Sequence, residues 1–166
     1  MFEMFFPDEI QENSYVIDYK KLYNGGIRGI IFDIDNTLVM HGYPADEKAI
    51  ALITELKAIG FKILLLSNNK EKRVEMFNRD VNVLYIYKAD KPAKKGYIKA
   101  MEMMGTNTQS TVFIGDQLFT DVWGAKRTGI RNILVKPIDK HEEIQIVLKR
   151  KLEAIVLYFY RRKYGN

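Results

Sequence analysis

The 166-residue sequence predicts an α/β fold in which a five-stranded parallel sheet carries helices on both faces. First, strand-like and helix-like segments alternate along the chain, which favours parallel strands joined by right-handed crossovers. Second, the strand-like segments are short, nearly continuous hydrophobic runs, typical of buried strands. Third, 47% of the residues are hydrophobic and 28% are charged, which is the usage of a globular chain that can bury one core.

Each element has its own local signal. Strands are expected over residues 27–33, 61–66, 81–87, 111–114 and 131–135, because these runs are apolar and bounded by turn residues. Helical periodicity predicts helices over residues 44–59, 70–79, 92–104, 118–128 and from 140 to about 160. We expect a single domain over residues 1–166, with residues 1–26 as an N-terminal extension and about 140–166 as a basic amphipathic helix.

Composition narrows the chemistry open to the chain. The absence of cysteine excludes disulfides, thiolate nucleophiles and cysteine-based metal sites. His41 and His141 are the only histidines, so a Ser-His-Asp triad is not expected and a multi-histidine metal site is excluded. The side chains that remain for catalysis or binding are carboxylates, hydroxyls and lysines, together with any hard cation that they bind.

Polar residues follow four of the expected strands, at the edge where ligands bind in such sheets. They are Asp33, Asp35, Asn36 and Thr37, then Ser67, Asn68 and Asn69, then Asp90 and Lys91, and finally Gly115, Asp116 and Asp121. Asp33 and Asp35 stand two apart on an extended segment and would repel each other unless a cation compensates. Each residue alone is an ordinary loop former, but the joint pattern indicates a site for a hard cation, with Mg²⁺ as the natural candidate.

These residues also resemble the motifs of a known family. Asp33-Ile34-Asp35-Asn36-Thr37 resembles the DxDx[TV] signature of haloacid dehalogenase-like (HAD) phosphatases. Ser67, Lys91 and the segment from Gly115-Asp116 to Asp121 are similar to the second, third and fourth motifs, in family order, over roughly residues 27–137. The finer pattern, with DIDNTLV, LSNNKEKRV, KADKP and GDQLFTDVWGAKR, resembles the YqeG-type branch of subfamily IIIA over nearly the whole chain. The resemblance implies a HAD-like Rossmannoid fold.

The resemblance implies an enzyme, a Mg²⁺-dependent phosphomonoester hydrolase that works through an aspartyl-phosphate. Asp33 would be the nucleophile, and Asp35 the general acid for the leaving alcohol and then the base for water. Mg²⁺ would be held by Asp33, by the backbone carbonyl of Asp35 and by Asp116. Phosphoryl-transfer pumps of the superfamily carry threonine at the position of Asp35, so aspartate there implies rapid hydrolysis.

The remaining motif residues would hold the phosphate and support the loops. Ser67, the backbone N–H of Asn68, and Lys91 would bind the phosphoryl oxygens as preorganised donors. Asp121 would orient Lys91 or a metal-bound water. Thr37 would brace the first loop.

The spacing of the motifs predicts that no cap domain is inserted. The intervals from Asp35 to Ser67 and from Lys91 to Asp116 each have room for about one helix and one strand. An open cleft is therefore expected, which suits a bulky substrate unless an oligomer partner supplies a lid. Organellar relatives of the YqeG type look like phosphatidylglycerophosphate phosphatases, and this lipid is the expected substrate.

Other functions stay open at this point. The substrate could instead be a soluble or macromolecular phosphomonoester, such as a nucleotide, a sugar phosphate or a nucleic-acid end. The chain could also be a non-catalytic HAD-like binding module. Lys136-Pro137 after the last strand would suit a response-regulator receiver, but the acid after the fourth strand is then unexplained.

The basic surplus is concentrated at the C-terminus. Residues 149–166 hold six Lys and Arg side chains and one acid, Glu153, so they carry the whole net charge of +5. The last helix should show an apolar stripe of Ile144, Val147 or Leu148, Leu152, Ile155 and Phe159. This stripe could pack on the sheet, or the tail could bind an anionic membrane peripherally. No motif for sequence-specific nucleic-acid binding is found. The N-terminus does not resemble a signal peptide and no run is long enough to span a bilayer, so a cytoplasmic protein is expected.

Overall fold

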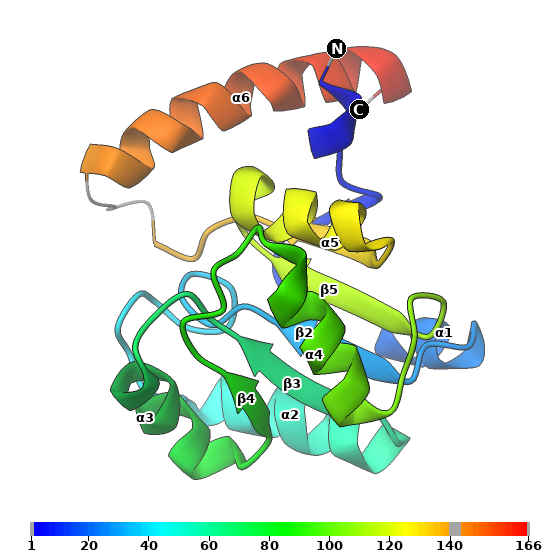
Figure 1. Ribbon diagram of the computed structural model, residues 1–166, viewed down its shortest axis with the longest axis vertical. Coiled ribbons are helices and arrows are strands. Elements are labelled where there is room, and N and C mark those ends of the chain that lie inside the picture. Colours follow the sequence, from blue (N-terminus) through cyan, green and yellow to red (C-terminus); the bar gives the residue numbers. More distant parts are fainter. Residues whose placement is uncertain (1, 140–143, 166) are drawn as a thin grey trace.

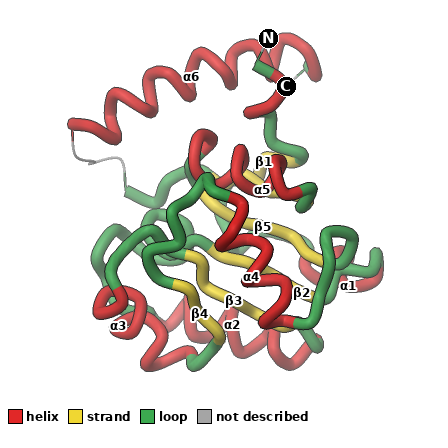
Figure 2. The backbone as a smooth tube through the Cα atoms, in the orientation of Figure 1, coloured by secondary structure: helices red, strands yellow, loops and turns green. Residues whose placement is uncertain are grey.

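The computed structural model describes residues 2–139 and 144–165. At its centre lies a sheet of six parallel strands in the order β1-β6-β5-β2-β3-β4 (Figures 1 and 2). The strands are β1 (Glu9–Gln11), β2 (Gly29–Phe32), β3 (Lys62–Leu66), β4 (Leu84–Ile86), β5 (Thr111–Gly115) and β6 (Arg131–Val135). The predicted parallel α/β fold is confirmed, with one strand more than expected.

The extra strand is β1, at the edge of the sheet beside β6. Its three residues are half-buried and include one hydrophobic side chain, Ile10, so it lacks the apolar run that identified the other strands. The segment expected as an N-terminal extension thus contributes β1, a short 3₁₀ turn η1 (Glu3–Phe5) and the helix α1 (Tyr19–Asn24).

The other helices match the predicted segments. They are α2 (Glu47–Ile59), α3 (Glu71–Val81), α4 (Lys94–Met104), the π-helical turn η2 (Leu118–Val122) that continues into α5 (Trp123–Thr128), and α6 (Ile144–Tyr164). One boundary is wrong: Val81 belongs to α3, and the following strand starts only at Leu84. The reason is Asn82, whose left-handed backbone (φ +49°) ends the helix. The first residues expected in the last helix, 140–143, lie outside the described part.

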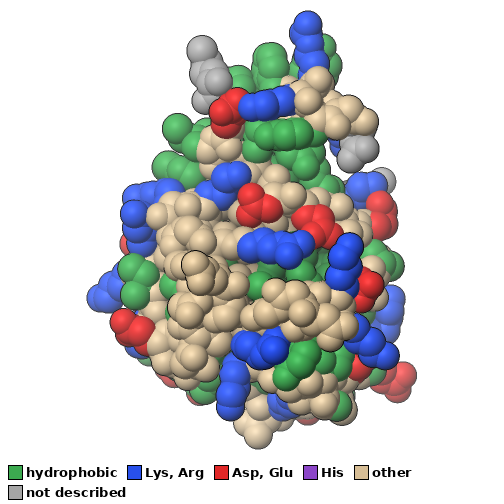
Figure 3. Space-filling model, turned by 90° about the vertical axis from the view of Figure 1, so that its right-hand side faces the viewer, with side chains coloured by type: hydrophobic (Ala, Val, Ile, Leu, Met, Phe, Trp, Pro, Cys, Tyr) green, Lys and Arg blue, Asp and Glu red, His purple; other side chains and the backbone are tan. Residues whose placement is uncertain are grey.

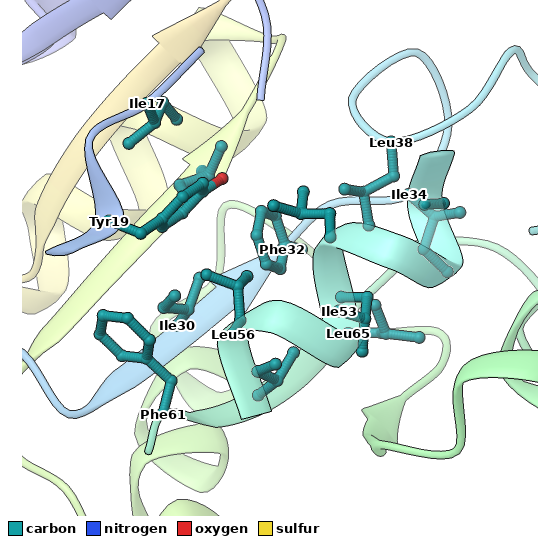
Figure 4. Packing of buried hydrophobic residues seen from close by; sticks show 14 of the residues in the cluster. Ile17, Tyr19, Ile30, Phe32, Ile34, Leu38, Ile53, Leu56, Phe61 and Leu65 are labelled. Carbon is teal, nitrogen blue, oxygen red and sulfur yellow. The ribbon is translucent and has the colours of Figure 1, made fainter. Parts of the chain in front are cut away.

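The buried side chains form a layer on each face of the sheet. On one face Ile30 and Phe32 of β2 pack with Ile53 and Leu56 of α2 and with Tyr19 of α1 (Figure 4). On the other, Ile31 of β2 and Phe113 of β5 pack with Tyr97 and Ala100 of α4 and with Ala125 of α5. Residues of β2 alternate between these layers, as the period of a strand requires. Both faces are therefore covered by helices, as predicted.

Helix α6 lies at one end of the molecule, beyond α5 and η2 (Figures 1 and 2). It packs through Val156 and Tyr160, which join Phe6, Leu118 and Leu134 in a third apolar cluster. The stripe expected to pack on the sheet faces solvent instead, because the packed side chains stand on the opposite side of the helix. No helix in the described residues is long and apolar enough to cross a membrane.

No cap domain interrupts the chain between the motif residues. Between Asp35 and Ser67 lie one helix, α2, and one strand, β3. Between Lys91 and Asp116 lie α4 and β5. The side chain of Asp46 caps the start of α2 by accepting the Ala49 N–H at 2.8 Å. Helix α2 alone links β2 to its neighbour β3.

Candidate active site

The sequence-predicted residues meet at the carboxyl edge of the sheet. Strands β3 and β5 both pair with β2, so the residues that follow these three strands converge. A cleft of about 320 Å³ opens there. It is lined by Asp33, Asp35, His41, Ser67, Asn68, Asn69, Lys91, Gln117, Thr120, Ile146 and Lys149.

Lys91 joins two of the acidic residues below the cleft. Its Nζ atom lies 2.7 Å from Asp33 Oδ1 and 2.7 Å from Asp121 Oδ1, and all three side chains are buried. Burial opposes the charge of the ammonium group, but the two carboxylates raise the pKa of Lys91, so it stays protonated. The lysine thus places a fixed positive charge beside Asp33.

Asp121 orients this lysine. While Oδ1 accepts from Lys91, Oδ2 accepts the backbone N–H groups of Asp116 and Gln117, each at 3.1 Å. Gly115 makes the contact possible, because a Cβ atom there would lie 2.4 Å from Asp121 Oδ2. Both carboxylate oxygens of Asp121 are engaged, and one of them contacts Lys91, the first of the two groups that Asp121 was expected to orient.

Asp116 faces Asp33 across the hydroxyl of Thr37. Thr37 Oγ1 lies 3.1 Å from Asp116 Oδ1 and 3.3 Å from Asp33 Oδ2. One carboxylate oxygen each of Asp33, Asp116 and Asp121 lie within 4.8 Å of one another. Burial raises the pKa of Asp116 well above its usual range, and the charge of Asp33 adds to the effect. Burial likewise raises the pKa of Asp33 to about 6, against the opposing effect of Lys91.

Asp35 is held on the other side of the cleft. Its Oδ1 accepts the Gly42 N–H at 2.9 Å and two guanidinium N–H groups of Arg73, from Nε at 3.1 Å and Nη2 at 2.8 Å. Burial works against the charged form, but the Gly42 N–H and the Arg73 cation hold the pKa of Asp35 below its usual range. The second oxygen, Oδ2, lies 3.4 Å from Asn69 Nδ2 on the cleft wall.

Ser67 and Asn68 form the wall that follows β3. Ser67 Oγ is buried and accepts the Asn69 N–H at 3.0 Å. The Asn68 side chain donates to the Lys91 carbonyl at 3.0 Å and accepts the Lys91 N–H at 2.7 Å. The structure therefore gives Asn68 a contact that the motif did not predict: its side chain fixes the loop that carries Lys91.

Three residues of the site were not predicted from the sequence. Arg73 binds Asp35 from α3, and Arg150 reaches the site from α6, where its guanidinium contacts the Asp116 carboxylate and donates to the Asp116 carbonyl at 2.6 Å. Glu153 accepts from Arg150 at 2.9 Å and from the Leu118 N–H at 2.8 Å. The sequence does carry one signal for Glu153. It is an acidic residue inside an apolar run, and such a residue is rarely buried without a partner.

Helix α6 also changes the expected shape of the site. Ile146 and Lys149 of this helix line the cleft. The expectation of an open site is thus only partly met, since the amino-terminal half of α6 forms one wall. Lys136 forms an ion pair with the exposed Glu12 at 2.6 Å and does not line the cleft. The response-regulator receiver alternative needs this lysine beside the acidic residues, so the structure does not favour it.

The chain is similar to known proteins over most of its length. Residues 40–129 match the family model of the haloacid dehalogenase-like hydrolases. The chain is 38% identical over 162 residues to a protein of Bacillus subtilis named "probable phosphatase YqeG", covering 97% of this chain and 94% of that one. It is also 27% identical over 160 residues to phosphatidylglycerophosphate phosphatase 1 of Arabidopsis thaliana, of which it spans 45%.

Solved structures show the same fold. The cobalt-bound deoxy-D-mannose-octulosonate 8-phosphate phosphatase of Haemophilus influenzae superposes with a TM-score of 0.53 at 16% identity, covering 83% of this chain and 90% of that one. An uncharacterised protein of Listeria monocytogenes superposes with a TM-score of 0.55 at 15% identity, covering 75% of this chain and 99% of that one.

Proposed function

Since this chain belongs to the haloacid dehalogenase-like hydrolases and is a phosphatase of that family, we propose that it hydrolyses a phosphomonoester with Mg²⁺ through an aspartyl-phosphate on Asp33. The observation that carries the proposal is the placement of Asp33 at the floor of the cleft. Its Oδ1 lies 2.7 Å from the Lys91 ammonium group, and Asp35 stands on the opposite wall.

The side chains around Asp33 fit a small hard cation. One carboxylate oxygen each of Asp33 and Asp116 lie within 4.8 Å of each other, at a place where burial disfavours two negative charges. Arg150 contacts the Asp116 carboxylate from α6. Carboxylate and carbonyl oxygens are the ligands that Mg²⁺ prefers. We assign Asp33, the carbonyl oxygen of Asp35 and Asp116 as its ligands. When bound, Mg²⁺ would neutralise negative charge on the phosphoryl group and on the nucleophile.

The chain's own residues then divide the reaction into two steps. A carboxylate oxygen of Asp33 attacks phosphorus and the bond to the alcohol oxygen breaks, while Asp35 gives that oxygen a proton. Gly42 and Arg73 keep Asp35 ionised in the free enzyme, so Asp35 takes up this proton on Oδ2, away from both groups, when the negatively charged phosphoryl group enters the cleft. In the second step Asp35 accepts a proton from water, which attacks phosphorus, releases inorganic phosphate and frees Asp33. Lys91, the Ser67 hydroxyl and the Asn68 N–H hold the phosphoryl oxygens. The two hydrogen bonds from Arg73 keep Asp35 oriented between the steps.

For the substrate we propose phosphatidylglycerophosphate. Two curated relatives carry this lipid in their names, the second being 25% identical over 148 residues and from Chlamydomonas reinhardtii. The chain spans about half the length of each. A headgroup phosphate could enter the cleft beside α6 while the lipid tails stay outside, since no inserted domain encloses the site within residues 2–139.

The test is phosphate release from phosphatidylglycerophosphate in mixed micelles, with Mg²⁺ or with EDTA. A soluble aryl phosphate, the Asp33→Asn variant and an exposed control, Asp80→Asn on α3, are assayed beside it. We expect Mg²⁺-dependent release that Asp33→Asn loses by about 10⁴-fold or more and that Asp80→Asn retains. Hydrolysis of the aryl phosphate alone would preserve the mechanism and reject the lipid. Activity in Asp33→Asn would reject the nucleophile.

A further inference from the structure

The outer face of α6 carries five large hydrophobic side chains in water. Their exposed fractions are 81% for Ile144, 59% for Leu148, 57% for Leu152, 50% for Ile155 and 41% for Phe159. At about 100° per residue these positions fall within an arc of about 80°. We call them the outer stripe. Contiguous apolar surface of this kind is uncommon on soluble proteins and marks a site of interaction.

The opposite face of the same helix is already occupied. Val156 and Tyr160 pack against the domain, and Glu153 binds the Leu118 N–H. Arg150 contacts Asp116 from this inner side. The outer stripe therefore cannot turn inward without breaking these contacts. Phe159, at its end, contacts the Phe2 ring, and the other four side chains are left for a partner from outside the domain.

Charge identifies the partner. Lys151 borders one edge of the outer stripe, and Arg162 lies one turn beyond Phe159 at the end of the stripe; both are exposed. In the described part of the helix Glu153 is the only acidic residue, and it is buried on the inner face. A helix with an apolar face bordered by basic residues is the pattern of a segment that lies in the interface of an anionic bilayer.

A neighbouring cavity has the same chemistry. Phe2, Phe6 and Phe159 line a hollow of about 410 Å³ between η1 and the end of α6, together with Glu3, Arg162 and Lys163. The Phe2 and Phe159 rings lie 5.5 Å apart. Hydrophobic side chains gather at this end of the molecule, beside basic ones (Figure 3). Aromatic walls suit an acyl chain, and Arg162 at the rim suits an anionic headgroup, while Lys163 at the same rim is paired with Glu3.

We propose that the outer stripe of α6 docks the enzyme on an anionic lipid bilayer. This docking deepens the proposed function. Only the advantage of docking for hydrolysis of a lipid substrate rests on that function. The inner face of the docked helix reaches the cleft through Ile146 and Lys149, so docking would hold the active site beside the phosphorylated headgroups. The docking itself requires no catalysis and can be measured without it.

The test uses the full chain carrying Asp33→Asn, in EDTA, with sedimenting vesicles of phosphatidylcholine alone or with 30% phosphatidylglycerol. We expect binding to the anionic vesicles to be about tenfold tighter or more. A variant with Leu148→Ser, Leu152→Ser and Ile155→Ser should lose this binding by about tenfold or more. A matched variant with Val16→Ser, Ile98→Ser and Met103→Ser removes exposed hydrophobic side chains elsewhere and should bind like the parent.

Thermal unfolding followed by circular dichroism checks that both triple variants are folded. Equal binding of the two triple variants, or equal binding to both kinds of vesicle, would overturn the proposal. So would a concentration-dependent dimer that only the outer-stripe variant loses, because a second copy would then cover the stripe. Docking without release of phosphate from lipid by the enzyme with Asp33 would keep this inference and reject the proposed substrate.

Discussion

The catalytic cluster and helix α6 both depart from the rule that charged side chains are exposed and hydrophobic side chains are buried. The cluster buries Asp33, Lys91, Asp116 and Asp121, whereas α6 leaves the outer stripe in water. Buried charges are costly unless they are paired, and exposed apolar faces are costly unless something covers them. Within the cluster the pairing is visible, since Lys91 bridges two carboxylates. At α6 we propose a partner outside the chain, so the two regions would serve internal chemistry and external recognition respectively.

Among the variants that test this comparison, Lys91→Met is expected to have the largest effect on the free energy of unfolding. The change leaves Asp33 and Asp121 buried without their cation, which should lower the free energy of unfolding by about 3–5 kcal/mol at pH 8. The loss should be smaller at pH 5, because a protonated carboxyl group needs no counterion. Urea denaturation in EDTA at both pH values measures it. Lys72→Met, at an exposed position of α3, is the control. Equal small losses in both variants would mean that the pairing is not what stabilises the cluster.

A smaller loss is expected from Gly115→Ala. The new Cβ atom would press on Asp121 and displace the carboxylate that orients Lys91. Overpacking of this kind costs about 1–3 kcal/mol, and phosphatase activity should fall with it. Gly26→Ala, where the added Cβ meets nothing within 4 Å although φ is +102°, should cost about 1 kcal/mol and leave activity unchanged. Denaturation and turnover of an aryl phosphate distinguish the two, and unchanged turnover in Gly115→Ala would contradict the role of Asp121.

The cluster should also respond to pH. Burial raises the pKa of Asp33 to about 6, so the nucleophile becomes protonated as the pH falls below that value. We expect kcat/KM at limiting Mg²⁺ to fall about tenfold per pH unit below about pH 6. Because a cation favours the ionised carboxylate, saturating Mg²⁺ should move this acid limb to lower pH. The pH profile of aryl phosphate hydrolysis at two Mg²⁺ concentrations tests both statements, and a limb that ignores Mg²⁺ would place the cation away from Asp33.

The smallest effect on stability is expected at the outer stripe. Leu152→Ala removes a side chain that is already in water, so the free energy of unfolding should change by less than about 0.5 kcal/mol. Val156→Ala, one turn further on the inner face, should cost about 1–3 kcal/mol because it leaves a cavity. Similar losses in the two variants would show that the stripe is covered within the molecule.

The parts of the fold that could be predicted are those in which local pattern and burial agree. The strands that carry Asp33, Ser67 and Asp116 are apolar runs, and parallel pairing brings their ends together. Strand β1 was not predicted because it has no apolar run of its own and is defined by its pairing with β6. Arg73 and Arg150 were missed because their contacts with Asp35 and Asp116 span 38 and 34 residues and depend on how helices pack. The stripe of α6 was seen correctly as apolar, but periodicity does not say which of two faces is covered.

The placement of β1 has a consequence for synthesis on the ribosome. Asp8, just before this strand, bonds to Asn132 of β6, which lies 124 residues later. At a synthesis rate of about 5–20 residues per second, about 6–25 s pass before the partner strand exists. During this time β2, β3, β4 and β5 can pair with one another, while β1 has no neighbour. Of the six strands, β1 is therefore translated before the others and joins the sheet only after β6 has been made.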